Sequence, residues 1–112
     1  MITIKPYQFK LLSIEYDTNL AKHIMQDAYA RGIIPAQSYL MLDQIKKQII
    51  KSHEHGFRTE YAKAIYVFSS LCFGDDFDTD THYKFHTVFN NQELSPDVKA
   101  KMIDQLAQEE SS

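Results

Sequence analysis

Four carboxylates fall within residues 75–80, the densest group of side chains in this chain that could do chemistry. Three alternate members have the spacing of the first three ligands of a calcium-binding loop, namely Asp76, Asp78 and Asp80. Such a loop then needs a glycine where this chain has Thr81, and a bidentate glutamate where it has Thr87. We therefore do not expect the acidic segment to bind calcium.

The position of these acids relative to the neighbouring predicted helices separates two other roles. Asp78, Thr79 or Asp80 could cap the helix that follows, because a side-chain oxygen accepts from the unpaired N–H groups of a helix N-terminus. Asp75 and Asp76 instead follow the C-terminus of the preceding helix, where a negative charge is disfavoured by about 0.3–1 kcal/mol. Either they bond to N–H groups of the turn, or they contact a basic surface of a partner.

The second possibility predicts a partner-binding site in the acidic segment, made of Asp75, Asp76, Phe77, Asp78 and Asp80. Opposite charge on two surfaces favours their encounter and fixes their orientation. Phe77 has two interpretations, an apolar anchor for the partner or a core residue beneath the turn, and we favour the second.

The other reactive side chains do not form a catalytic motif. His82 and His86 stand four residues apart on a predicted helix, and zinc would need a third ligand such as Asp78 or Asp80. No His-Glu-x-x-His pattern is present, so two surface histidines are the favoured interpretation. Cys72 lies in the most apolar stretch, where we expect a buried, inert thiol. We predict a chain that is not an enzyme, with no catalytic residue, cofactor or resident metal.

The composition is that of one ordinary folded domain. The chain has 112 residues, of which 44% are hydrophobic and 24% charged, with a net charge of -3. A single cysteine excludes a disulfide framework and a four-cysteine zinc site. No basic stripe suits nucleic acid, and no signal-peptide pattern or membrane-length apolar run is present. We expect a soluble, cytoplasmic protein with neither nucleic acid nor membrane as a partner.

Glycine and proline are sparse, which favours long helices joined by few loops. Apolar spacing predicts one long helix, or two collinear ones, ending near Arg31, followed by helices over about 36–55, 60–73, 81–89 and 96–108. The second half of 60–73 is apolar nearly all round, as expected of a helix enclosed by others. The prediction is an all-α bundle of about five helices around residues 60–73, with a single domain over 1–108 and a frayed tail over 109–112.

Capping residues mark several of these helix ends. Thr3, Thr59 and Ser95 are the expected N-caps of the first, third and fifth helices. Gly56 and Gly74 are expected to end the second and third.

Tyrosine and phenylalanine are frequent, with seven of each, and the core can absorb most of them. The tyrosines that need not all lie inside are Tyr7, Tyr16, Tyr29, Tyr39 and Tyr83. Exposed tyrosine suits a protein-binding face, because it carries a large contact area and a polar tip at modest entropy cost.

Three consecutive segments form a distinctive group: His55-Gly56-Phe57-Arg58-Thr59-Glu60, the apolar helix over residues 64–73, and Gly74-Asp75-Asp76-Phe77-Asp78-Thr79-Asp80. This group resembles a family of small α-helical accessory proteins encoded in bacterial type VI secretion gene clusters, beside spike, adaptor and effector genes. The likeness covers roughly residues 50–106. After Asp80, family members continue with proline and a tryptophan-containing segment, whereas this chain has Thr81-His82-Tyr83-Lys84-Phe85 and no tryptophan.

The resemblance implies an accessory protein that binds a product of a neighbouring gene, an effector or spike component, as an adaptor or chaperone. The alternative is an immunity protein that neutralises a cognate toxin. An adaptor should present an exposed apolar groove for an effector helix, whereas a compact acidic face would favour immunity. A metal-dependent enzyme using His82, His86 and an aspartate is the third, disfavoured alternative.

Overall fold

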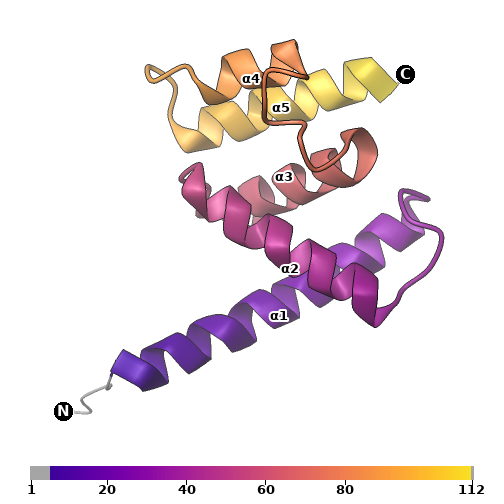
Figure 1. The fold of residues 1–112 in the computed structure, drawn as a ribbon, viewed down its shortest axis with the longest axis vertical. Helices are drawn as coiled ribbons and strands as arrows, with labels where there is room; N and C mark the ends of the chain where they lie inside the picture. Colours follow the sequence, from indigo (N-terminus) through magenta and orange to yellow (C-terminus); the bar gives the residue numbers. More distant parts are fainter. Residues whose placement is uncertain (1–5, 112) are drawn as a thin grey trace.

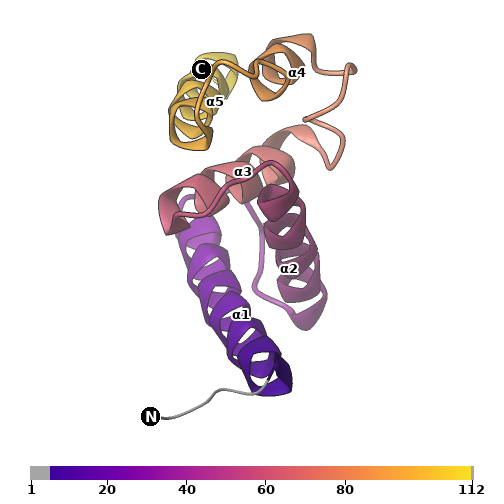
Figure 2. The same ribbon diagram turned by 90° about the vertical axis from the view of Figure 1, so that its left-hand side faces the viewer.

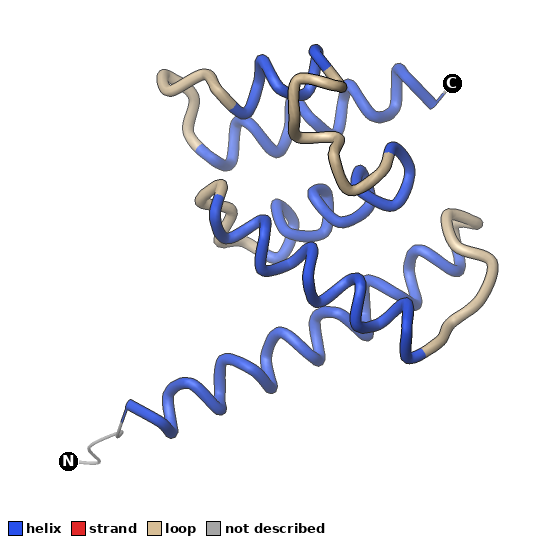
Figure 3. Tube along the Cα trace, viewed as in Figure 1, coloured by secondary structure: helices blue, strands red, loops and turns tan. Residues whose placement is uncertain are grey.

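Five α-helices and no strand make up the part of the chain that the structure describes, which is the backbone of residues 6–111 and the side chains of residues 18–110. Figure 1 shows the fold as a computed structural model, and Figure 3 shows that loops alone connect the helices. The helices are α1 (Pro6–Ala30), α2 (Tyr39–Glu54), α3 (Glu60–Phe73), α4 (Tyr83–Phe89) and α5 (Pro96–Ser111). The predicted all-α fold of five helices is confirmed.

The helices are stacked in three tiers, with α3 in the middle (Figures 1 and 2). At one end α1 and α2 cross and contact each other, and at the other end α4 lies beside α5. The central helix α3 packs against α1, α2 and α5, and its Phe73 ring also contacts the Phe85 ring of α4, which lies beside α5. The predicted arrangement around residues 60–73 is therefore observed, and the bounds of α3 are those predicted.

Two clusters of buried side chains lie on opposite sides of α3. One cluster fills the space between α3 and the α4–α5 tier, and its members are Phe57, Ala62, Tyr66, Phe77, Phe85, Val88, Phe89, Ala100 and Ile103. The other joins α3 to the α1–α2 tier, and its members are Leu20, Ala21, Ile24, Leu42, Ile45, Ile49 and Val67. Tyr66 and Val67 are consecutive yet belong to different clusters, so α3 is buried on two faces. This burial explains why its sequence is apolar nearly all round.

Threonine and serine fix the predicted starts of two helices. The Thr59 Oγ1 atom accepts from the Ala62 N–H at 3.1 Å at the start of α3, and the Ser95 Oγ atom accepts from the Val98 N–H at 3.3 Å at the start of α5. Each bond satisfies an N–H group that has no partner within the helix. The cap predicted at Thr3 lies outside the described residues.

The start of α2 differs from the predicted start near residue 36. The Ser38 Oγ atom accepts from the Met41 N–H at 3.1 Å, so the helix begins at Tyr39. Its other end is as predicted, because Gly56 adopts a left-handed conformation with φ of 80°. The Cβ that an alanine would carry at Gly56 would lie 3.3 Å from the Pro96 side chain at the start of α5.

The last helix continues beyond its predicted end near residue 108. α5 extends to Ser111, and in this last turn the Lys84 Nζ atom of α4 donates to the Glu110 carboxylate at 2.7 Å. The predicted fraying of residues 109–112 concerns motion and stays a prediction.

The prediction of a buried Cys72 is wrong, because this thiol is exposed near the end of α3. Cys72 lies in an open groove between the end of α1 and α5, beside Arg31 and Ala107, so the neighbouring helices do not cover it. Partial burial still raises the pKa of the Cys72 thiol above its ordinary value.

Candidate functional site

The acidic segment forms a series of turns between α3 and α4. It begins at Gly74, whose φ of 103° is a conformation that glycine adopts readily. Within the segment, the Phe77 N–H donates to the Gly74 carbonyl oxygen at 3.1 Å, and the Thr79 N–H donates to the Asp76 carbonyl oxygen at 3.0 Å. These backbone bonds turn the chain twice within a few residues and decide which side chains face inward.

Asp78 faces the interior and links three parts of the fold. Its carboxylate Oδ2 accepts from the Tyr66 hydroxyl of α3 at 2.7 Å and from the His55 Nε2 atom, just after α2, at 2.9 Å. Only 9% of the Asp78 side chain is exposed, so these bonds replace most of its contact with water. The His86 Nδ1 atom of α4 lies 3.3 Å from the Asp78 carbonyl oxygen. Asp78 therefore connects the turn to the end of α2, to α3 and to α4.

The protonation states within this network suit a structural role. Burial by itself would raise the pKa of Asp78, but the hydrogen bonds from Tyr66 and His55 and the nearby charge of Lys51 outweigh burial and lower that pKa. Burial and the hydrogen bond to Asp78 raise the pKa of Tyr66. Near neutral pH, Asp78 is thus an anionic acceptor and Tyr66 a neutral donor, and neither is poised to exchange a proton with a substrate.

Phe77 is fully buried and is not available at the surface as an apolar anchor. Its ring packs edge-to-face against Tyr66, with 4.9 Å between ring centroids, and against Phe85, with 5.5 Å. The partner-contact role considered for Phe77 is corrected accordingly: the side chain is a core residue beneath the turn, the interpretation favoured from the sequence.

The remaining acids of the predicted site, Asp75, Asp76 and Asp80, are exposed. The Gln44 Nε2 atom lies 3.4 Å from an Asp75 carboxylate oxygen, and the Asp76 carboxylate lies 3.7 Å from His82 Nε2. No described residue forms a hydrogen bond or ion pair with the Asp80 carboxylate. The structure thus divides the predicted site, with two residues inside and three outside.

None of these acids caps α4. The residue at its N-cap position is His82, which makes no side-chain capping bond. The capping role considered for Asp78, Thr79 and Asp80 is therefore wrong, because Asp78 faces the interior and the Thr79 hydroxyl donates to the Asp76 carbonyl oxygen at 2.7 Å.

His82 and His86 take separate partners rather than converging on one point. His82 faces Asp76 at 3.7 Å, whereas His86 faces the Asp78 backbone. Across the described part of the chain, no group of three or more His, Cys, Asp or Glu side chains has the geometry to hold a metal ion.

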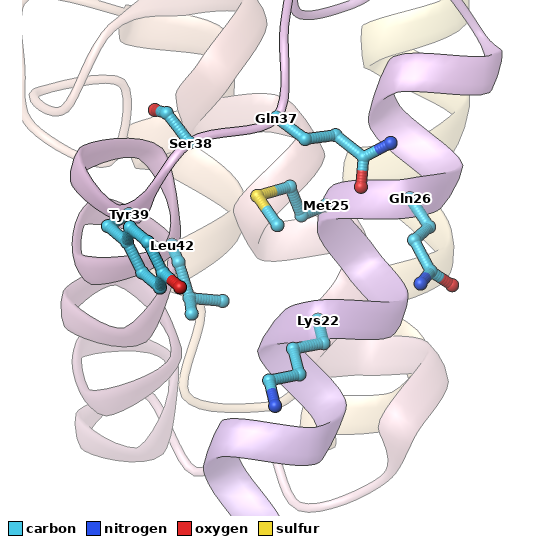
Figure 4. Close-up of a pocket in the computed structure, with 7 residues that line it drawn as sticks. All are labelled: Lys22, Met25, Gln26, Gln37, Ser38, Tyr39 and Leu42. Atoms are coloured by element: carbon cyan, nitrogen blue, oxygen red, sulfur yellow. The ribbon is translucent and has the colours of Figure 1, made fainter.

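An apolar groove between α1 and α2 is a second candidate site, and local sequence patterns did not reveal it. It measures about 400 Å³ and is lined by Lys22, Met25, Gln26, Gln37, Ser38, Tyr39 and Leu42. Figure 4 shows Lys22 and Met25 extending from α1 toward α2, where Leu42 and Tyr39 lie. The only sequence signal was Tyr39, one of five tyrosines that need not all lie in the core, and this side chain is 88% exposed.

The other described tyrosines of that set are exposed as well. Tyr83 is 76% exposed and Tyr29 is 49% exposed, whereas the side chains of Tyr7 and Tyr16 lie outside the described residues. Tyr83 lines a further groove, between α4 and α5, together with Lys84, Thr87, Val88, Met102, Gln105, Leu106 and Glu109.

Among the described residues, no helix has the length and apolar character needed to span a bilayer. Comparisons of the chain with protein-family models, with curated proteins and with solved structures find no match.

Proposed function

We propose that this chain acts without catalysis, as an accessory protein that binds another protein in an adaptor or chaperone role. The observation that carries the proposal is the groove between α1 and α2, where a largely apolar surface stays open to solvent beside the exposed ring of Tyr39. Tyrosine is enriched among the residues that contribute most to protein interfaces, and grooves between helices receive amphipathic helices of partners.

The acidic turn supports this role less directly. Asp78 and Phe77 are engaged inside the fold, and only Asp75, Asp76 and Asp80 remain for a partner. These three acids favour a second candidate function, an immunity protein whose acidic face covers a basic toxin cleft. Charge complementarity of this kind speeds association and orients the partners.

The resemblance of residues 50–106 to accessory proteins of type VI secretion clusters supplies a biological setting for the proposal. In that setting the partner is an effector or spike component encoded by a neighbouring gene, and the two proteins meet in the cytoplasm.

The test is isothermal titration calorimetry, in which the purified chain is titrated with each purified product of the neighbouring genes. We expect one of them to bind, and we expect a triple variant with Asp75→Asn, Asp76→Ser and Asp80→Asn to bind it within about twofold of the natural chain. Loss of more than about tenfold in affinity would favour the immunity role instead, and absence of binding to every product would overturn the proposal. Asp78 is kept in the variant because it stabilises the fold.

A further inference from the structure

The groove between α1 and α2 combines an adaptable apolar floor with an exposed aromatic rim. Leu42 is buried at the floor, and beside it lies Met25, a flexible side chain that can adjust to several shapes. The Ser38 cap starts α2 so that Tyr39 stands in the first turn, 88% exposed. A ring held in this position can close over an apolar side chain placed in the groove.

The charge around the groove selects the kind of partner. Lys22 lines the α1 side, and no described carboxylate forms an ion pair with it. Along the whole chain, residues 1–58 contain eight Lys and Arg against five Asp and Glu, whereas residues 59–112 contain four against ten. Among the residues that line the groove, the one charged side chain is that of Lys22.

We propose that this groove receives an amphipathic helix of a partner protein whose apolar face is flanked by acidic side chains. The apolar side chains pack on Met25 and Leu42 beneath Tyr39, and an acidic side chain at the flank pairs with Lys22. Helical residues three or four apart lie on the same face of a helix. Apolar residues at that spacing can therefore contact Met25 and Leu42 together, while an acidic residue beside them contacts Lys22. This inference rests on the proposed protein-binding function and names the chemistry of the partner.

The probe is a synthetic, capped peptide of about 15 residues, with leucine at helical spacing and glutamate and alanine elsewhere. A matched peptide carries lysine in place of every glutamate. The isotope-labelled chain is titrated with each peptide, and its backbone amide resonances are recorded by NMR. The glutamate peptide should shift the amide resonances of residues 22–26 and 37–42. We expect the lysine peptide to bind at least about fivefold more weakly, because its charges oppose Lys22.

Two pairs of variants locate the contact. Lys22→Glu should weaken binding of the glutamate peptide about fivefold, while Lys47→Glu, the same charge change at an exposed position of α2 outside the groove, should weaken it less than about twofold. Tyr39→Ala should weaken binding, while Tyr83→Ala, at the groove between α4 and α5, should not. Because all four side chains are exposed, none of these changes should disturb folding.

Several results would overturn the inference. They are equal binding of the two peptides, equal effects of Lys22→Glu and Lys47→Glu, and resonance shifts confined to the groove between α4 and α5. A further such result is a sedimentation coefficient of the chain alone that increases with its concentration, if Tyr39→Ala abolishes this increase. That result would assign the groove to a second copy of the chain instead. A chain that binds a co-encoded protein but ignores the glutamate peptide would keep the proposed function and lose this assignment.

Discussion

At the scale of single residues, Asp78 gives the acidic segment a structural role inside the fold. Its carboxylate is nearly buried and accepts hydrogen bonds from Tyr66 and His55, while its neighbour Phe77 lies in the core. Removing the acceptor would leave a buried hydroxyl and a partly buried imidazole without their partner. A penalty of about 1–3 kcal/mol is typical of such a loss.

We therefore predict that Asp78→Ala lowers the free energy of unfolding by about 1–3 kcal/mol, measured by urea denaturation. The matched control is Asp80→Ala, which removes an exposed carboxylate from the same turn and should change the free energy of unfolding by less than about 0.5 kcal/mol. Equal effects of the two substitutions would show that the inward network does not stabilise the turn.

The same residue gives a pH dependence with a definite sign. The pKa of Asp78 is lower in the folded chain than its ordinary value of 3.8, because the hydrogen bonds and the Lys51 charge outweigh burial. Its ionised form thus contributes stability above this ordinary value, and that contribution is lost as the pH falls through the folded-state value. We predict that the difference in unfolding free energy between the natural chain and Asp78→Asn shrinks as the pH falls below the ordinary value of 3.8. A difference that stays constant or grows as the pH falls below this value would contradict the assignment.

At the scale of the elements, the loop that follows α2 packs closely against the start of α5, where Gly56 lies beside Pro96. Gly56 has a positive φ, and a Cβ there would lie 3.3 Å from Pro96, whereas Gly32, with φ of 75°, has nothing within 4 Å of such a Cβ. Both positions disfavour alanine because of the left-handed backbone, by about 1–2 kcal/mol. Gly56→Ala carries the additional steric conflict.

Gly56→Ala should consequently lower the midpoint of thermal unfolding more than Gly32→Ala does. The comparison isolates the contact with Pro96, since the φ angles of the two glycines differ little, at 75° for Gly32 and 80° for Gly56. If Gly32→Ala were equally or more damaging, close packing of the α2 end on α5 would not be the reason for glycine at this position.

The sequence predicted the elements well because the information that defines them is local. The apolar run of α3 lies within about three helical turns, and the caps at Thr59 and Ser95 each lie within one. The inward direction of Asp78 depends on His55, which lies 23 residues away, so local spacing could not distinguish it from Asp80. The groove likewise arises where α1 contacts α2, so neither helix alone reveals it.

At the scale of the whole molecule, the tiers separate two kinds of surface. The α1–α2 tier carries the open apolar groove within the positively charged half of the chain, while residues 59–112 hold most of the acidic side chains. The central helix α3 holds the tiers together through two separate core clusters. In the proposed function, a partner bound in the groove would therefore leave the network around Asp78 undisturbed.

The most direct measurement is amide hydrogen exchange of the chain, alone and in the presence of its proposed partner, a co-encoded protein. The account predicts slower exchange on binding at residues 22–26 of α1 and at residues 37–42, with little change at residues 75–80. Protection confined to residues 75–80, with unchanged exchange at the α1–α2 groove, would contradict it.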